Sequence, residues 1–202
     1  MDKWDELADE KAIATTVEAL KANGFEAYVV ENRELAKQKV LELIPSGAEV
    51  MNMTSMTLES INVVKLITES GRFNPVRNRL AEMSDAKATE KRWLGAAPEW
   101  AIGSVHAVTQ DGHLLVASRT GSQLPAYAYG AAHVVWVVGA QKIVKNADEA
   151  MKRIHEHTFP LEDQRARKAY GVGSGVNKIL IINKEIQPKR AMVILVKEKL
   201  GF

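Results

Sequence analysis

The sequence predicts an α/β fold in which helices cover a mixed, mostly parallel β-sheet. Helical and strand-like hydrophobic periods alternate through the first half of the chain. Asp111-Gly112 separates two strand-like runs in the middle, which is typical of a tight antiparallel hairpin. The chain has 202 residues, 46% of them hydrophobic, and no long linker or internal repeat. One domain spanning residues 1–202 is therefore expected.

The first half is expected to alternate helices and strands. Apolar residues recur at helical spacing before Asn23-Gly24, and Asn32 is a suitable N-cap for a second helix. Asn74-Pro75 pairs a capping residue with proline at the first helical position. In chain order the prediction is a helix over 5–23, a strand over 25–30, a helix over 33–44, a strand over 48–52, a helix after Thr54-Ser55, and a helix from Asn74-Pro75.

The second half introduces antiparallel pairing. Strands over 100–109 and 113–118 flank the Asp-Gly turn, and a short helix is expected from Ser122 with Pro125 in its first turn. Val134 to Val138 is continuous and β-branched, as in a strand buried on both faces. Helices over 147–157 and 161–170 follow, and strands over 178–183 and 192–196 are predicted to form a closing hairpin.

Composition excludes several classes of protein. Lys plus Arg is 27 and Asp plus Glu is 25, so a net charge of +2 gives no reason to expect a nucleic-acid or membrane-surface partner. Cysteine is absent, which excludes disulfides, thiolate-bound metals or clusters and a thiol nucleophile. The acidic start of the chain, Met1 to Glu6, lacks the apolar stretch of a signal peptide, and no apolar run is long enough to cross a bilayer. A cytoplasmic location is expected.

Two segments have the form of a ligand-binding loop between a strand and a helix. In open α/β sheets such loops gather at the carboxyl ends of the strands, where helix N-termini offer unpaired N–H groups to anions. The first segment offers Asn52, Thr54 and Ser55, although ordinary helix capping also explains it. The second offers a fixed charge, hydroxyls, an amide and a glycine for close approach, in Arg119, Thr120, Gly121, Ser122 and Gln123. Its alternative interpretation is an N-cap at Ser122 beside a solvated arginine.

Lys142 and His106 are the candidate catalytic residues. Lys142 follows the most apolar strand, where it can neutralise an anion or act as an acid–base group if burial lowers its pKa. His106 is a polar residue close to a strand that the hairpin places against the core. The alternatives are a solvated lysine and a structural histidine. The pair His155 and His157 has i, i+2 spacing, which does not direct two rings to one helix face, so no metal site is predicted.

Two other features carry less information. The glycine-rich run Gly171 to Gly175 precedes a strand instead of following one, so it does not fit a dinucleotide-binding turn, but it suits a loop near the site. Basic residues are interleaved with acidic ones between residues 72 and 92, as on a solvated helical face.

Several stretches together resemble the LUD domain family, which is associated with lactate utilisation. The resemblance covers most of the chain and is strongest from about residue 100 onward. It lies in Gly103-Ser104-Val105-His106-Ala107-Val108-Thr109, Asp111-Gly112-His113-Leu114-Leu115, Thr120-Gly121-Ser122-Gln123-Leu124-Pro125, Val135 to Val144, Asn177-Lys178 and Leu195 to Phe202.

The resemblance implies a three-layer α/β/α fold like that of the ribose-phosphate isomerase, glucosamine-phosphate deaminase and CoA-transferase group. It also implies a protein that helps iron–sulfur partners to oxidise L-lactate to pyruvate and binds a small anionic or nucleotide-like ligand. Without cysteine, the redox chemistry would reside in those partners. The sugar-phosphate enzymes have a glycine-rich turn where this chain has Asn52 to Ser55, so the resemblance does not imply phosphate binding by that segment.

Two other classes of function stay open from the sequence. One is an independent enzyme, either an ATP-dependent 5-formyltetrahydrofolate cyclo-ligase or a sugar-phosphate isomerase. The other is a non-catalytic adaptor that holds iron–sulfur subunits together.

Overall fold

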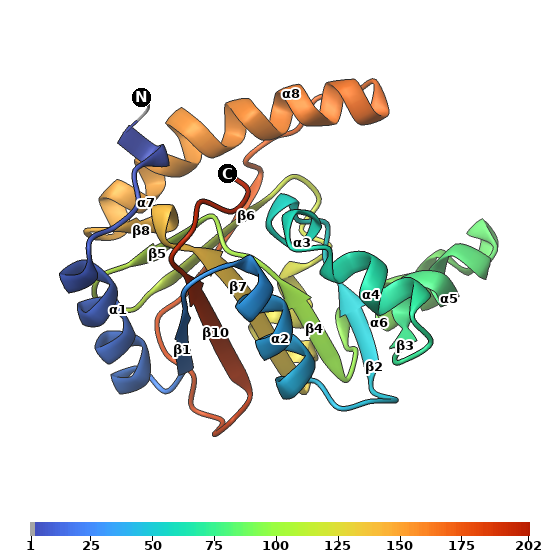
Figure 1. The fold of residues 1–202 in the computed structure, drawn as a ribbon. Coiled ribbons are helices and arrows are strands. Elements are labelled where there is room, and N and C mark those ends of the chain that lie inside the picture. Colours follow the sequence, from blue (N-terminus) through green and yellow to red (C-terminus); the bar gives the residue numbers. More distant parts are fainter. Residues whose placement is uncertain (1–2) are drawn as a thin grey trace.

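A computed structural model describes residues 3–202; Met1 and Asp2, from the acidic start of the chain, lie outside the described residues. Six parallel strands form the main sheet in the order β1-β10-β7-β4-β2-β3, which confirms the α/β fold with a mostly parallel sheet (Figure 1). The six strands are β1 (Glu26–Val30), β2 (Glu49–Asn52), β3 (Asn74–Pro75), β4 (Trp100–Gly103), β7 (His133–Gly139) and β10 (Ala191–Val196).

The antiparallel hairpin belongs to a second, four-stranded sheet in the order β8-β5-β6-β9. Its strands are β5 (Ala107–Thr109), β6 (Leu114–Ser118), β8 (Ile143–Val144) and β9 (Lys178–Ile182). The predicted turn at Asp111-Gly112 is present between β5 and β6. The strand expected over 100–109 is interrupted at residues 104–106, where the chain leaves the main sheet and enters the second one.

Helices cover both faces of the main sheet. One face packs against α2 (Arg33–Leu43), α3 (Met56–Ser60) and α4 (Val63–Glu69). The other packs against α1 (Glu10–Ala22), α5 (Val76–Glu82), α6 (Ala88–Ala96), the π-helical turn η3 (Ala126–Gly130) and the inner face of the second sheet. Short 3₁₀ turns occur at η1 (Lys3–Asp5), η2 (Asp85–Lys87) and η4 (Ala140–Lys142). The side chains of Val134 and Val135 point to opposite faces and both are fully buried, as expected of a strand inside a covered sheet.

The two helices expected in the last third form one continuous helical run. It consists of α7 (Ala147–Arg153), the π-helical turn η5 (Ile154–Thr158) and α8 (Phe159–Tyr170). Pro160 lacks the N–H that would continue the α-helical ladder, and its ring would crowd the carbonyl four residues earlier. A wider π turn just before the proline avoids both problems without breaking the helix. The outer face of the second sheet packs on the α7 and η5 side chains Ala150 and Ile154.

The predicted closing hairpin is wrong. β10 lies between β1 and β7 and is parallel to both, whereas β9 pairs antiparallel with β6 in the other sheet. All six residues of β10 are buried, so this strand fits the centre of the main sheet. A smaller difference occurs at Asn74-Pro75, which pairs with β2 as β3; the following helix begins one residue after the proline, at Val76.

Within residues 3–202, no helix is both long enough and apolar enough to span a bilayer.

Candidate functional site

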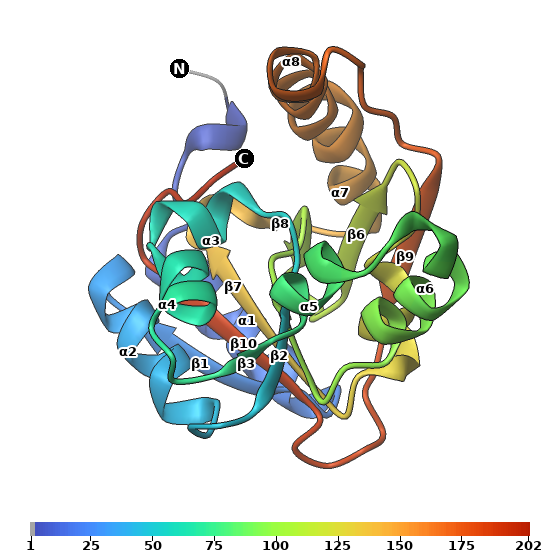
Figure 2. The ribbon, with the colours of Figure 1, turned by 90° about the vertical axis from the view of Figure 1, so that its right-hand side faces the viewer.

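A cavity of about 1020 Å³ opens at the carboxyl ends of β2, β4 and β7, between the main sheet and α8. Figure 2 shows α8 above the second sheet, with the α3 region across from it. Most of the predicted site residues line this one cavity, although they come from four separate stretches of chain: Thr54, Ser55, His106, Arg119, Thr120, Gly121, Ser122, Gln123 and Lys142. Asn52 does not line it, because its side chain points into the protein and is only 4% exposed.

Lys142 is held by three neutral oxygen atoms at the deep side of the cavity. Its Nζ lies 2.9 Å from Thr57 Oγ1, 3.1 Å from Ser104 Oγ and 3.2 Å from the Val105 carbonyl oxygen. Turn η4 positions it directly after β7, while Thr57 comes from α3 and Ser104 from the end of β4. The residue is 2% exposed, so it is not a solvated lysine. Burial and the positive charge of Arg153 hold the pKa of the Lys142 amine well below its ordinary value.

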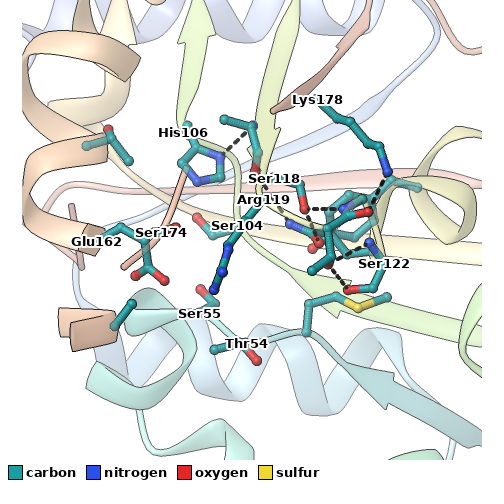
Figure 3. A pocket seen from close by; sticks show the side chains of 18 of the residues that line it. Thr54, Ser55, Ser104, His106, Ser118, Arg119, Ser122, Glu162, Ser174 and Lys178 are labelled. Carbon is teal, nitrogen blue, oxygen red and sulfur yellow. Dashed lines mark hydrogen bonds between the residues drawn. The ribbon is translucent and has the colours of Figure 1, made fainter. Parts of the chain in front are cut away.

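His106 stands beside this cluster with a defined tautomer. Its Nδ1 accepts a hydrogen bond from the Ala117 N–H at 3.1 Å, so in the neutral ring the proton is on Nε2 (Figure 3). Its carbonyl oxygen accepts a hydrogen bond of 2.5 Å from the buried guanidinium of Arg153. Burial, with the charges of Lys142 and Arg153, lowers the pKa of His106 to about 3. The ring is therefore neutral near pH 7 and can donate from Nε2. We call Thr57, Ser104, His106 and Lys142 the inner wall.

The segment after β2 is organised by an arginine from α5. Arg77 donates from Nε to the Asn52 carbonyl oxygen at 2.8 Å and from Nη2 to Thr54 Oγ1 at 2.9 Å. Ser55 caps α3 by accepting the Leu58 N–H at 3.4 Å. The capping role expected for this segment is thus present, and the exposed Thr54 hydroxyl remains at the cavity surface.

Residues Ser118 to Gln123 form the opposite edge of the cavity, which we call the rim. The Gly121 N–H donates to Ser118 Oγ at 2.9 Å and the Ser122 N–H to Thr120 Oγ1 at 3.3 Å. The expectation that unpaired N–H groups here would bind an anion is therefore wrong for these two, because the rim's own hydroxyls accept them. Arg119 is exposed at the cavity, and Figure 3 shows its side chain extending into it.

The family assignment rests on the sequence as well as on this fold. The sequence model of the LUD domain family matches residues 13–196. The chain belongs to the LUD domain family. A crystal structure of a DUF162 family protein from Deinococcus radiodurans has a similar fold, with a TM-score of 0.56 over 95% of this chain and 99% of that chain. The sequence identity of 12% limits that likeness to the fold. A search of curated proteins gave no match to this sequence.

The cavity of this LUD domain is strongly cationic. Apart from the buried amine of Lys142, the charged side chains among the described residues that line it are one carboxylate, Glu162, and six cations: Arg77, Lys91, Arg92, Arg119, Arg165 and Lys178. The charge of Glu162 is neutralised by a bidentate salt bridge with Arg165, in which both hydrogen bonds are 2.7 Å long. An anion entering the cavity therefore meets a positive potential that its own walls do not cancel.

Several cavity residues of this LUD domain were not predicted as site residues. Arg77, Lys91 and Arg92 belong to the basic region that was interpreted as a solvated helical face, but all three line the cavity. The glycine-rich loop lies near the site as expected: Gly173 to Gly175 line the cavity, and the Ser174 N–H is held by Asp163 at 2.8 Å. The side chain of Tyr127 covers Gly103 at the end of β4. Within residues 3–202, no group of three or more His, Asp or Glu side chains is arranged to hold a metal ion.

Proposed function

We propose that this LUD domain binds a small organic anion in the cavity and serves lactate utilisation, with the oxidation of L-lactate to pyruvate carried out together with iron–sulfur partner proteins. The observation that carries the proposal is the excess of cationic side chains around one cavity that also contains the predicted polar segments. The family association supports the metabolic setting, and the absence of cysteine leaves the electron-transfer clusters to the partners.

The size of the cavity favours a ligand larger than lactate. Pockets for drug-sized ligands have volumes of about 300–1,000 Å³, and this cavity has about 1020 Å³. Lactate has only six non-hydrogen atoms and would leave most of that space to water. An anion of nucleotide size, or a small acid bound beside a second anionic group, fills it better. This is the reason to keep an independent nucleotide-using enzyme as the second candidate function.

The inner wall and the rim have different roles in this proposal. Arg119, Thr120 and Ser122 would bind the anionic group, because their polar side chains are exposed at the cavity. Gln123 would hold the rim in place, since its amide bonds to Ser118 and Ala117. Lys142 and His106 would act on the ligand, since burial lowers the pKa of both groups and so favours their uncharged forms.

Titration calorimetry of the purified protein tests the binding step. Phosphate, L-lactate, pyruvate and ATP are titrated in parallel at low salt, where surface electrostatics are least screened. At least one of them is expected to bind, and Arg119→Ala is expected to weaken its affinity about tenfold, the loss of one charge-assisted contact. Arg33→Ala is the matched control, because it removes the same charge from α2, outside the cavity. No binding of any of the four, or equal weakening by both variants, would contradict the proposal.

A second experiment separates the assisted from the independent function. The protein is mixed with iron–sulfur lactate-utilisation subunits, and the oxidation of L-lactate is followed with and without it. Dependence of the rate on this chain is expected. Turnover of ATP by the isolated chain with a formylated folate would instead favour the ligase, and co-purification with the subunits without any ligand binding would favour the adaptor.

A further inference from the structure

We propose that the Lys142 amine condenses with the carbonyl group of an aldehyde or ketone that also carries an anionic group, forming a Schiff base inside the cavity. The inference rests on the proposed function, because the same cavity must first bind the anion. It adds a covalent step and a substrate class, the oxo-anions.

The surroundings of the amine favour a nucleophile over a salt-bridged lysine. Its three partners are two hydroxyls and one carbonyl, and no carboxylate among residues 3–202 lies within ion-pairing distance of it. A buried ammonium normally requires an anionic partner to offset its lost hydration. The charge that acts on its pKa is instead that of another cation, the fully buried Arg153. Burial beside a second cation is the usual means by which a lysine amine is kept neutral and nucleophilic.

The hydroxyl partners allow the neutral amine to be held without blocking it. A neutral amine has two N–H groups and one lone pair. The Val105 carbonyl can only accept, so it takes one N–H, while Thr57 can accept the second because its own proton is used at the Leu200 carbonyl, 3.1 Å away. Ser104 then either donates to the lone pair or turns its proton to the Val105 carbonyl, 3.3 Å away. Rotation of this one hydroxyl frees the lone pair for attack.

The other two lysines of the cavity lack this environment. Lys178 is exposed and donates to the Thr120 carbonyl at 2.7 Å, and Lys91 is paired with Asp85 at 3.0 Å. Neither is buried among hydroxyl and carbonyl groups as Lys142 is. Lys142 is the lysine of the cavity whose surroundings favour the uncharged amine.

The reaction balances with the groups present. The Nζ lone pair attacks the carbonyl carbon, the C–N bond forms, and the carbonyl oxygen takes up a proton to give a carbinolamine. The oxygen then leaves as water with the second amine proton, and a C=N bond remains. The hydroxyl of Ser104, which can accept one proton while donating another, is the group on the same wall that can pass these protons, and the neutral His106 ring can donate a hydrogen bond from Nε2 to the carbonyl oxygen. No electrons are transferred and no other reactant is needed.

Trapping by borohydride tests the proposal on the full chain. Pyruvate, glyoxylate and glyceraldehyde 3-phosphate are each incubated with the protein and sodium borohydride, and peptide mass spectrometry locates the reduced adduct. One adduct per chain is expected at Lys142, with at least about tenfold higher occupancy than at any other lysine. L-Lactate, which has no carbonyl group to condense, is the negative control.

Two variants make the result specific. Lys142→Met removes the amine and is expected to abolish the adduct, whereas Lys145→Met removes an exposed lysine three residues away and is expected to leave it unchanged. Circular dichroism checks that both variants are folded, and trapping on the unmodified chain remains informative if Lys142→Met is not.

Calorimetry with the same three oxo-anions distinguishes the failure of this step from the failure of the proposed function. Binding without an adduct at Lys142 would overturn the covalent step and leave anion binding intact. Absence of both binding and adduct would overturn the two together, and adducts spread evenly over exposed lysines would show that Lys142 has no special reactivity.

Discussion

The inner wall and the rim of the cavity are built from different kinds of hydrogen bond. Lys142 bonds to residues that lie 85 and 38 positions away in the sequence, Thr57 and Ser104. The side-chain bonds within the rim span two to five positions, as between Thr120 and Ser122 or Ser118 and Gln123. Two further bonds reach the rim from the start of β9, where Asn177 and Lys178 donate to its backbone carbonyls. The inner wall therefore exists only when the main sheet is complete, whereas the rim is largely defined by its own sequence. Changes in the wall should affect the whole fold, and changes in the rim should remain local.

The largest effect on stability is expected for Gly103→Ala, at the end of β4 behind the wall. A Cβ atom there would lie 1.7 Å from the Tyr127 hydroxyl oxygen, and the Tyr127 side chain is only 2% exposed, so the ring must move out of a packed site. We expect the free energy of unfolding to fall by about 2–4 kcal/mol. Urea unfolding measures it. Because the clash involves one partner, Gly103→Ala combined with Tyr127→Leu should cost less than the sum of the two single changes; strict additivity would show that the clash is not the cause.

An intermediate effect with a defined pH dependence is expected for Lys142→Met. The folded state lowers the pKa of Lys142, so the unfolded chain binds more protons between the folded and unfolded pKa values, and the wild type gains stability as pH rises through that window. The variant lacks this gain. Its deficit relative to wild type should therefore grow as the pH rises towards the unfolded lysine pKa of about 10.4, by at most about 1.4 kcal/mol per pH unit.

Chemical unfolding at several pH values checks the sign of this change. Lys145→Met, from the exposed position nearby, should show a difference from wild type that does not vary with pH. A deficit that shrinks with rising pH would indicate that the Lys142 ammonium is stabilised in the folded state.

The smallest effect is expected at the rim, for Gly121→Ala. Gly121 has a φ of +85°, which costs a residue with a side chain about 1–2 kcal/mol. The new Cβ would lie 2.7 Å from Lys178 Cδ, but that side chain is flexible and exposed and can move aside. Gly47→Ala is the matched control, with a φ of +83° and no atom within 4 Å of the added Cβ. Unfolding free energies of the two variants within about 0.5 kcal/mol of each other are expected; a much larger loss at Gly121 would mean that the rim is coupled to the rest of the fold.

The same contrast, between features set by neighbouring residues and features set by distant ones, determines how much could be predicted from the sequence. Capping residues, apolar periods and the Asp111-Gly112 turn act over a few positions, and they predicted most of the helices and strands and the loops that line the cavity. The position of β10 between β1 and β7 depends on pairings across the whole chain, and its proximity to β9 in sequence suggested a hairpin instead.

The site follows the same division. The rim was predicted from adjacent residues, and Lys142 from its place after a buried strand. The partners that hold Lys142, Thr57 and Ser104, were not predicted as such, because no local signal shows that α3 and the end of β4 meet there. Arg77 and Arg92 were assigned to a solvated helix face, since alternating charges are typical of one, and Arg92 is indeed exposed. Their place at the cavity depends on how α5 and α6 are arranged around it, which no local signal shows.

The strand order of the main sheet also bears on how the protein is made. β1 pairs only with β10, so a strand that ends at Val30 has no neighbour until the chain has been synthesised as far as residues 191–196. Until then the backbone N–H and C=O groups of β1 that pair with β10 have no strand partner, and unpaired strand edges of this kind are prone to aggregate. The synthesis of β10 thus ends the period in which the nascent chain can aggregate through this edge of β1.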